Sequence, residues 1–135
     1  MYSWGVGSYC ALGFGNKRDQ KMPKELKVKV SSRAKKIIRI ACGQLHSMCV
    51  TANGRILSWG TGKQGQLGFG NTKDVLVPTI IPELSAEEID MISCGETHSA
   101  CITSVGVLYT WGNNTHGRLG IGSDAMEVKC IPTPT

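Results

Sequence analysis

Aromatic side chains are scarce in this chain of 135 residues, and long apolar runs are missing. Phe, Trp and Tyr make up 6% of the sequence while 41% is apolar, so a core has to be built mainly from Val, Ile and Leu. No run of about 18 apolar residues is present, and we therefore expect no membrane-spanning helix. The N-terminus lacks a basic region followed by an apolar one, so we expect no secretory signal and place the protein in the cytoplasm or the nucleus.

Disulfide bonds are not expected either, although the sequence has six cysteines. Four of them, Cys42, Cys49, Cys94 and Cys101, are two positions of a repeat that occurs twice. Cysteine buries readily as a small apolar residue, and free thiols are the rule in a reducing compartment. We therefore interpret these cysteines as core residues.

What the sequence does have is a stretch that occurs nearly twice, over residues 40–70 and 92–122. Trp59 of the first copy returns 52 residues later as Trp111, and Trp4 opens a third, shortened copy. A fixed period of about 50 residues, with Gly and Trp at set places, indicates a repeat protein built from one supersecondary unit per period.

Within each period we expect short strands joined by glycine-rich turns. Residues 47–51 and 55–59 are apolar runs on either side of Asn53-Gly54, a dipeptide typical of a type I′ hairpin turn. The second hairpin turns at 104–106. Four antiparallel strands per unit, repeated, predict the blade of a β-propeller.

Three further elements are expected between the hairpins. Leu26, Val28 and Val30 alternate with lysines, a pattern that predicts a half-buried strand. Residues 84–88 carry Ser and Glu at capping-box spacing and predict one helical turn. Residues 75–81 are extended, and Pro78 within them indicates an edge strand.

The glycine and tryptophan motifs closely resemble the RCC1 repeat, named for the regulator of chromosome condensation. The motifs that carry the resemblance are Gly43-x-x-His46-Ser47, Leu57-Ser58-Trp59-Gly60 and Gly65-Gln66-Leu67-Gly68. The resemblance implies a seven-bladed β-propeller in which glycines allow tight turns and the Trp-Gly strand packs between blades. The structural repeat positions are Trp4, Gly5, Gly43, His46, Trp59, Gly60, Gly68, Gly95, His98, Trp111, Gly112 and Gly120.

The fold we expect is therefore an all-β, RCC1-like β-propeller fragment of about two and a half blades of four-stranded antiparallel sheet. Its repeats are placed at 1–54, 55–106 and, in part, 107–135, and the terminal residues 131–135 are expected to begin another blade. So few units cannot close a seven-bladed ring, because a repeat array needs neighbours to bury its faces. We favour a piece of a longer chain over self-assembly of copies.

No catalytic, metal-binding or cofactor-binding residue is expected. Cys42, His46 and Cys49 lack the paired spacing of a zinc site, and their recurrence in the next repeat favours histidines that bond backbone groups at blade turns. The same recurrence speaks against a cysteine nucleophile. Residues 60–65 fit G-x-G-x-x-G, but the segment that follows is a poor helix start, so no dinucleotide site is expected.

The positive charge is concentrated in one connection between motifs. Residues 17–39 hold ten basic side chains against Asp19 and Glu25, whereas the rest of the chain has five basic and eight acidic ones. Such a cluster can engage nucleic acid, an anionic lipid surface or an acidic protein. The alternative, which we favour because the segment lacks aromatic stacking residues, is a solvated rim loop. The candidate partner-binding residues are Lys17, Arg18, Lys21, Lys24, Lys27, Lys29, Arg33, Lys35 and Lys36.

The function we expect is a protein-interaction scaffold without catalysis of its own, since rigid propellers present binding loops on their faces. The resemblance also implies two alternatives: a guanine-nucleotide exchange factor for a Ran-type small GTPase, or the substrate-recruiting propeller of a larger ubiquitin ligase or kinase. Relatives that sense ultraviolet light do so through clustered tryptophans. Here the three tryptophans occupy the ordinary repeat position, so this role is not expected.

Overall fold

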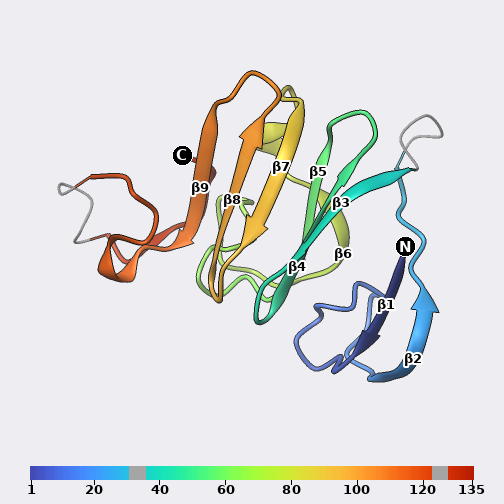
Figure 1. Cartoon of the computed structure of the whole chain (residues 1–135). Helices are drawn as coiled ribbons and strands as arrows, with labels where there is room; N and C mark the ends of the chain where they lie inside the picture. The colour runs from blue at the N-terminus through green and yellow to red at the C-terminus, as the bar shows by residue number, and fades with distance from the viewer. Residues whose placement is uncertain (31–35, 123–127) are drawn as a thin grey trace.

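The computed structural model describes residues 1–30, 36–122 and 128–135, and it consists almost wholly of short antiparallel strands (Figure 1). The strands are β1 (Tyr2–Gly5), β2 (Gln20–Glu25), β3 (Ile37–Cys42), β4 (His46–Thr51), β5 (Ile56–Gly60), β6 (Val75–Ile80), β7 (Ile89–Cys94), β8 (His98–Thr103), β9 (Leu108–Asn113) and β10 (Cys130–Ile131). Two 3-10 turns, η2 (Pro82–Leu84) and η3 (Thr115–Gly117), complete the described elements. No helix in these described ranges is long and apolar enough to cross a membrane.

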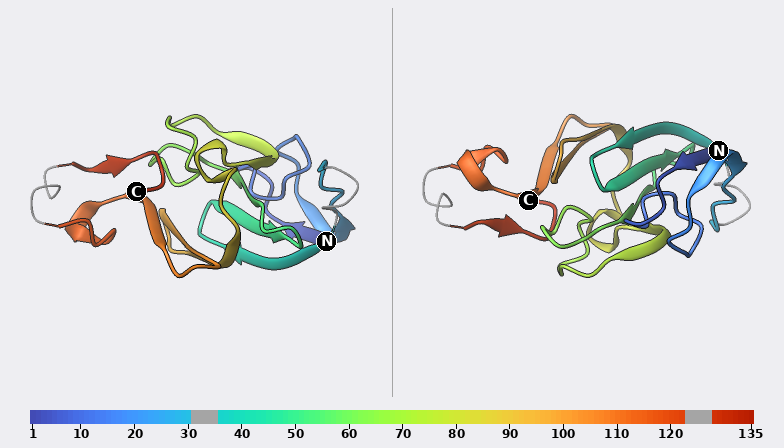
Figure 2. Two further views of the ribbon diagram at one scale, coloured as in Figure 1. Left: turned by 90° about the horizontal axis from the view of Figure 1, so that it is seen from above. Right: turned by 90° about the horizontal axis from the view of Figure 1, so that it is seen from below.

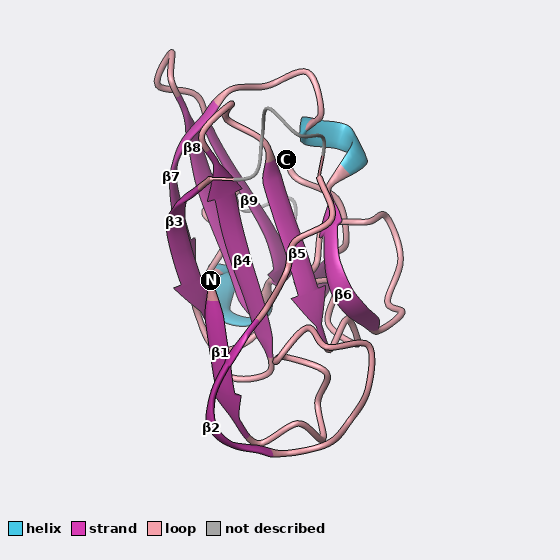
Figure 3. Cartoon of the chain, turned by 90° about the vertical axis from the view of Figure 1, so that its right-hand side faces the viewer, coloured by secondary structure: helices cyan, strands magenta, loops and turns pink. Residues whose placement is uncertain are grey.

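The strands form two complete blades and half of a third. One sheet has the order β3-β4-β5-β6, the next has β7-β8-β9-β10, and β1 pairs with β2 alone. Seen from above and below, the two four-stranded sheets lie side by side with β1 and β2 toward one end (Figure 2). From that end, the strands of the first blade are seen as one twisted sheet (Figure 3). The expected all-β propeller fragment of about two and a half blades is confirmed.

The hairpin turns repeat, but the first is not of type I′. Gly54 has a φ of 74°, while Asn53 is not among the residues with positive φ. The Gly54 N–H donates to the Thr51 carbonyl and the Thr51 N–H to the Arg55 carbonyl, both at 2.9 Å. This is a three-residue loop that ends in one left-handed glycine, whereas type I′ requires positive φ at two residues. The second hairpin closes in the same way at Gly106.

Two elements begin or end where the sequence did not indicate. The prediction of a strand over residues 26–30 is wrong, because β2 ends at Glu25. Beyond it, the Val30 N–H donates to the Val28 carbonyl and not to a neighbouring strand. The helical turn predicted over 84–88 is also wrong. It lies at Pro82–Leu84, where Pro82 supplies the fixed φ that suits a first helical position.

The C-terminal strand belongs to a blade that has already begun. Residues 131–135 were expected to open a new blade, but Cys130 and Ile131 pair with Asn113 and Gly112 of β9. The two Thr135–Thr110 backbone hydrogen bonds, of 3.0 and 3.1 Å, extend this pairing. The segment is therefore the fourth strand of the blade that starts at β7. Pro78 does lie in an edge strand, as predicted, because β6 ends its sheet.

Adjacent units are joined by apolar contacts and by donors that share one carbonyl. The blade interface is formed by a cluster that includes Met48, Ile56 and Trp111. Within it the Trp111 indole N–H donates to the Gln66 carbonyl at 2.9 Å, and the Ser99 hydroxyl donates to the same oxygen at 2.7 Å. Trp111 thus attaches its own blade to the preceding one both by burying apolar surface and by a hydrogen bond.

The junction one repeat earlier has the same arrangement. Trp59 and Ser47 both donate to the Ala11 carbonyl, at 2.8 and 3.0 Å. Leu26, Cys49 and Leu57 form the apolar cluster around this tryptophan. Equivalent residues therefore hold both junctions.

The close approach of β4 to β5 predicts a graded effect of alanine at two glycines. Gly60 has a φ of 115°, and a Cβ there would lie 2.5 Å from the Leu45 carbonyl oxygen and 2.7 Å from the His46 Cα. Gly106 also has positive φ, but no described atom lies within 4 Å of its Cβ position. Gly60→Ala should lower the free energy of unfolding by about 3 kcal/mol, and Gly106→Ala by about 1 kcal/mol.

Urea unfolding of both variants measures this difference. Equal losses for the two would show that only the dihedral strain matters and that the contact with β4 does not.

Candidate partner-binding surface

The loop before β2 is held by short side chains that bond to the backbone. The Asp19 carboxylate accepts the Gly7 N–H at 2.9 Å, and Asn16 Oδ1 accepts the Arg18 N–H at 3.0 Å. One repeat later, Asp74 accepts from Gly62 at 3.0 Å and Asn71 from Lys73 at 2.9 Å. These asparagine and aspartate turns fix the loop backbone without using the side chains of residues 17 and 18.

The exposed basic side chains follow this loop and the segment after it. We name this set the basic surface, and its described members are Lys17, Arg18, Lys21, Lys24, Lys27, Lys29 and Lys36. Arg33 and Lys35, which were also predicted, lie outside the described residues. The segment runs along the N-terminal end of the molecule (Figure 1). Because these side chains are exposed, their charges are available to a partner.

Alternating burial aims two of the lysines outward. Leu26 is buried and Val28 is half-buried, while Lys27 and Lys29 between and after them are exposed. Both lysines line a shallow hollow of about 100 Å³ next to Pro78 of β6. The predicted alternation is therefore present, although the segment is not a strand.

The described members of the basic surface have no ion-pair partner among the described residues. The salt bridge found among the described residues joins Arg39 to Asp90 at 3.8 Å, with both side chains more than half exposed. Lys24 instead lies over the Phe14 ring, with its ammonium nitrogen 4.9 Å from the ring centre. Such a contact positions the cation but leaves its charge in place.

The charge of this surface is not required by the fold. The next repeat has Thr72 where the loop has Lys17, with the same backbone bonds on either side. The connection that follows it carries Glu83, Glu87, Glu88 and Asp90. The two connections therefore differ in charge although their opening loops share the same backbone bonds.

His46 is a structural residue at the blade interface. Its Nε2 lies 2.9 Å from the Ser99 hydroxyl oxygen, and that hydroxyl donates its only hydrogen to the Gln66 carbonyl. Nε2 must therefore carry the proton and donate to Ser99. The expectation of a bond to backbone is thus wrong for this ring, because its partner is a side chain of the neighbouring blade.

The repeat-equivalent His98 is only partly buried. Burial lowers its pKa first, and the nearby Arg118 lowers it further. Among the described residues, no three His, Cys, Asp or Glu side chains gather closely enough to hold a metal ion. Nothing in the described part of the chain thus assembles a metal site around either histidine.

The buried cysteines are poor nucleophiles. Burial raises the pKa of Cys49 and of Cys101 to about 12, so neither forms an appreciable thiolate near neutral pH. Cys94 is raised to about 12 as well, by burial and then by the neighbouring Cys42. All six cysteines are free.

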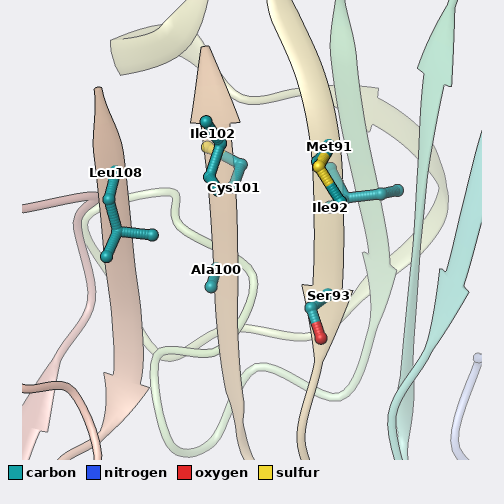
Figure 4. Close-up of a pocket in the computed structure, with 7 residues that line it drawn as sticks. All are labelled: Met91, Ile92, Ser93, Ala100, Cys101, Ile102 and Leu108. Carbon is teal, nitrogen blue, oxygen red and sulfur yellow. The ribbon is translucent and has the colours of Figure 1, made fainter. Parts of the chain in front are cut away.

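A second surface is apolar and lies on the outer face of the last blade. A hollow of about 110 Å³ is formed there by side chains of β7, β8 and β9 (Figure 4). The residues that line it are Met91, Ile92, Ser93, Ala100, Cys101, Ile102 and Leu108. Met91 and Leu108 are 57% and 59% exposed, which is high for side chains of this kind.

The sheets, their shared carbonyls and the glycine turns define a pair of propeller blades, and the sequence matches one family at each of its repeats. The model described as "Regulator of chromosome condensation (RCC1) repeat" matches residues 1–50, 53–102 and 106–135. A second model of the same description matches 37–66 and 90–118. The chain belongs to the RCC1 repeat family.

Relatives of this chain occur in several kinds of protein. The chain is 42% identical over 122 residues to the ultraviolet-B receptor UVR8 of Arabidopsis thaliana, covering 90% of this chain and 27% of that protein. It is 37% identical over 126 residues to the human E3 ubiquitin-protein ligase HERC2, covering 92% of this chain and 2% of the ligase. The chain thus spans about a quarter or less of these relatives.

Solved structures agree on the fold. Yeast RCC1 (Prp20), in a crystal structure with Kap60, superimposes with a TM-score of 0.85 at 21% identity, over 99% of this chain and 32% of that one. Human WBSCR16 gives 0.80 at 22% identity, over 99% and 33%. The chain is similar in shape to about a third of each.

The buried imidazole predicts a loss of stability in mild acid. Burial, and then the neighbouring His98, lowers the pKa of His46 from 6.5 to about 4. As the pH falls, the unfolded chain therefore takes up a proton before the folded one does. The contribution of neutral His46 to the free energy of unfolding is complete above about pH 6.5 and is lost as the pH falls toward 4. Its size is about 3 kcal/mol.

Chemical unfolding between pH 7.5 and pH 4 measures this contribution against His46→Gln, which keeps an N–H donor but does not titrate. The difference in stability between the two proteins should shrink as the pH falls. A difference that stays constant with pH would contradict a neutral, buried His46.

Proposed function

We propose that this chain is a propeller segment that serves as a protein-interaction scaffold in the cytoplasm or the nucleus, without catalysis of its own. The proposal rests on one contrast. The blades are held rigidly, whereas the positive charge of the connection over residues 17–39 is not needed to hold them. The blades are fixed by the shared Ala11 and Gln66 carbonyls, while the basic surface lies outside them and is free of internal ion pairs among the described residues.

The partner that fits this surface best is an acidic protein. The described cations are mostly lysines, two of them in β2 and the others in the irregular stretches on either side, and lysine suits a charged surface better than the planar recognition that arginine gives. Aromatic residues that could stack on bases are also missing from residues 17–39. Nucleic acid and anionic lipid are therefore the competing outcomes of the test.

A second candidate function is guanine-nucleotide exchange on a Ran-type GTPase. It is favoured by the superposition on Prp20p, whose structure is described together with its binding properties to Gsp1p and histones. The E3 ligase relatives favour a third role, the recruitment of substrates within a larger ligase. Exchange factors of this family are expected to wedge the GTPase apart with loop residues, and we cannot identify such a wedge here by matching residues.

Neutralising the basic surface should weaken binding to an acidic polypeptide. The triple variant Lys21→Gln, Lys27→Gln, Lys29→Gln should bind a polyglutamate probe about tenfold more weakly at low salt, because it loses three unpaired exposed cations. Fluorescence anisotropy of the labelled probe measures the change. Raising the salt from about 50 to about 300 mM should erase most of the difference.

A variant of equal charge serves as the control. Lys63→Gln, Lys73→Gln, Lys129→Gln removes the same charge from the rest of the chain and should bind the probe nearly as the unmodified protein does. Equal weakening in both triples, or tighter binding to duplex DNA or anionic vesicles than to polyglutamate, would count against an acidic protein partner.

The exchange hypothesis predicts a different result from the scaffold. When a Ran-type GTPase loaded with a fluorescent guanine nucleotide is mixed with this protein, nucleotide release should stay at its spontaneous rate. Stopped-flow fluorescence measures the rate, with EDTA as the positive control for release. Clear acceleration would replace the scaffold with an exchange factor.

A further inference from the structure

A small hollow lies where the segment after β2 meets strand β6 of the first complete blade. Its volume is about 100 Å³, and it is lined by Gly13, Lys27, Lys29, Val77 and Pro78. The glycine follows β1 along the chain, the two lysines follow β2, and the last two residues belong to β6. Two successive units therefore build the hollow together.

The apolar floor of the hollow is held in place by the fold. A Cβ at Gly13 would lie 3.0 Å from Leu26 Cδ2 and 3.2 Å from Pro78 Cδ, so its backbone packs closely against both side chains. Two residues further on, the Gly15 N–H donates to the Leu76 carbonyl of β6 at 3.0 Å. The loop and the strand are thus tied to each other, and the hollow is formed before any partner arrives.

Strand β6 offers apolar side chains here, but not a complete edge for an added strand. Val77 is 47% exposed, although valine is usually buried. Pro78 has no N–H, so a strand added to β6 would lose a ladder hydrogen bond at this point. A partner would therefore make contact by inserting a side chain and not by extending the sheet.

The two lysines place positive charge beside this apolar floor. Lys27 and Lys29 alternate with buried Leu26 and half-buried Val28, so both point to the same side of the segment and away from the core. The salt bridge found in the described ranges involves neither of them. An anionic group next to an inserted side chain would thus meet two uncompensated cations.

The corresponding place at the next junction has the same backbone but different side chains. There the Gly70 N–H donates to the Pro132 carbonyl at 2.9 Å, as Gly15 does at the first junction. The counterparts of the two lysines and of the exposed valine are Pro82, Leu84 and Thr133. The framework therefore requires neither the lysines nor the valine, which favours a role for them in binding.

We propose that this hollow binds a linear segment of an acidic protein, with a leucine side chain in the hollow and a carboxylate on either side of it facing Lys27 and Lys29. An acidic segment without the leucine leaves the apolar floor exposed, and an apolar segment without carboxylates leaves both lysines unpaired. Because residues two apart point to the same side of an extended chain, the matching pattern is Glu-x-Leu-x-Glu.

This inference rests on the proposed acidic partner and adds the place and the residues of contact. Two peptides, Gly-Glu-Gly-Leu-Gly-Glu-Gly and the same sequence with serine for leucine, test it in NMR titrations of the ¹⁵N-labelled 135-residue protein at low salt. The leucine peptide should bind about tenfold more tightly, because burial of its side chain adds to the same charge. Its largest shifts should fall on the amides of Gly13, Gly15 and Val77.

Two variants separate the apolar floor from the charge. Val77→Thr, which introduces the residue found at the next junction, should reduce the preference for leucine to about twofold or less while leaving the serine peptide nearly unaffected. Lys27→Gln with Lys29→Gln should weaken both peptides about fivefold. The pair Lys63→Gln and Lys73→Gln removes equal charge elsewhere and should leave both affinities nearly unchanged.

The outcomes distinguish this inference from the acidic partner itself. Equal affinities for the two peptides, with polyglutamate still bound, would overturn the hollow as a binding site and leave the acidic partner in place. If neither peptide nor polyglutamate binds, both proposals fail. Self-association that excludes the peptide, or tighter binding of laurate than of the leucine peptide at the same amides, would assign the hollow to a different occupant and overturn the proposal.

Discussion

Each complete blade places two donors, an indole N–H and a hydroxyl, on a single loop carbonyl of the unit before it, and the arrangement of the units depends on this shared acceptor. Trp59 and Ser47 meet at Ala11, and Trp111 and Ser99 meet at Gln66. The carbonyl precedes a Leu-Gly step whose glycine has positive φ in both cases. A Cβ at Gly13 would lie 2.9 Å from the Trp59 indole nitrogen, and one at Gly68 would lie 3.0 Å from that of Trp111. The glycine and the tryptophan therefore require each other.

This dependence explains which parts of the chain repeat and which do not. Positions that meet a neighbouring unit recur, because each junction needs the same donors, the same acceptor and the same space. Solvent-exposed side chains of the connections are not constrained in this way, and the two connections differ in charge, one basic and the other acidic. The residues that hold the junctions and those that differ in charge are thus separate positions of the same repeat.

The sequence was sufficient for the repeat, the hairpins and the edge position of Pro78, because glycine, proline and period report local backbone requirements. It was insufficient where the outcome depends on a distant partner. The place of β10 is set by pairing with β9, and the proton of His46 is set by a hydroxyl 53 residues away. The turn at Asn53 was misjudged because an Asn-Gly pair suits more than one hairpin loop. Ser47 and Ser99 were overlooked as donors, although their spacing of 52 residues was a visible signal.

The asparagine and aspartate turns before β2 and β6 have a consequence for how such a chain diversifies. Asn16 with Asp19, and Asn71 with Asp74, hold their loops entirely through backbone groups. A codon change at the positions between them alters charge without altering conformation, and its effect on stability is small because surface substitutions away from special features usually are. Duplicated units of this kind can therefore acquire new binding preferences one loop at a time while every copy keeps folding.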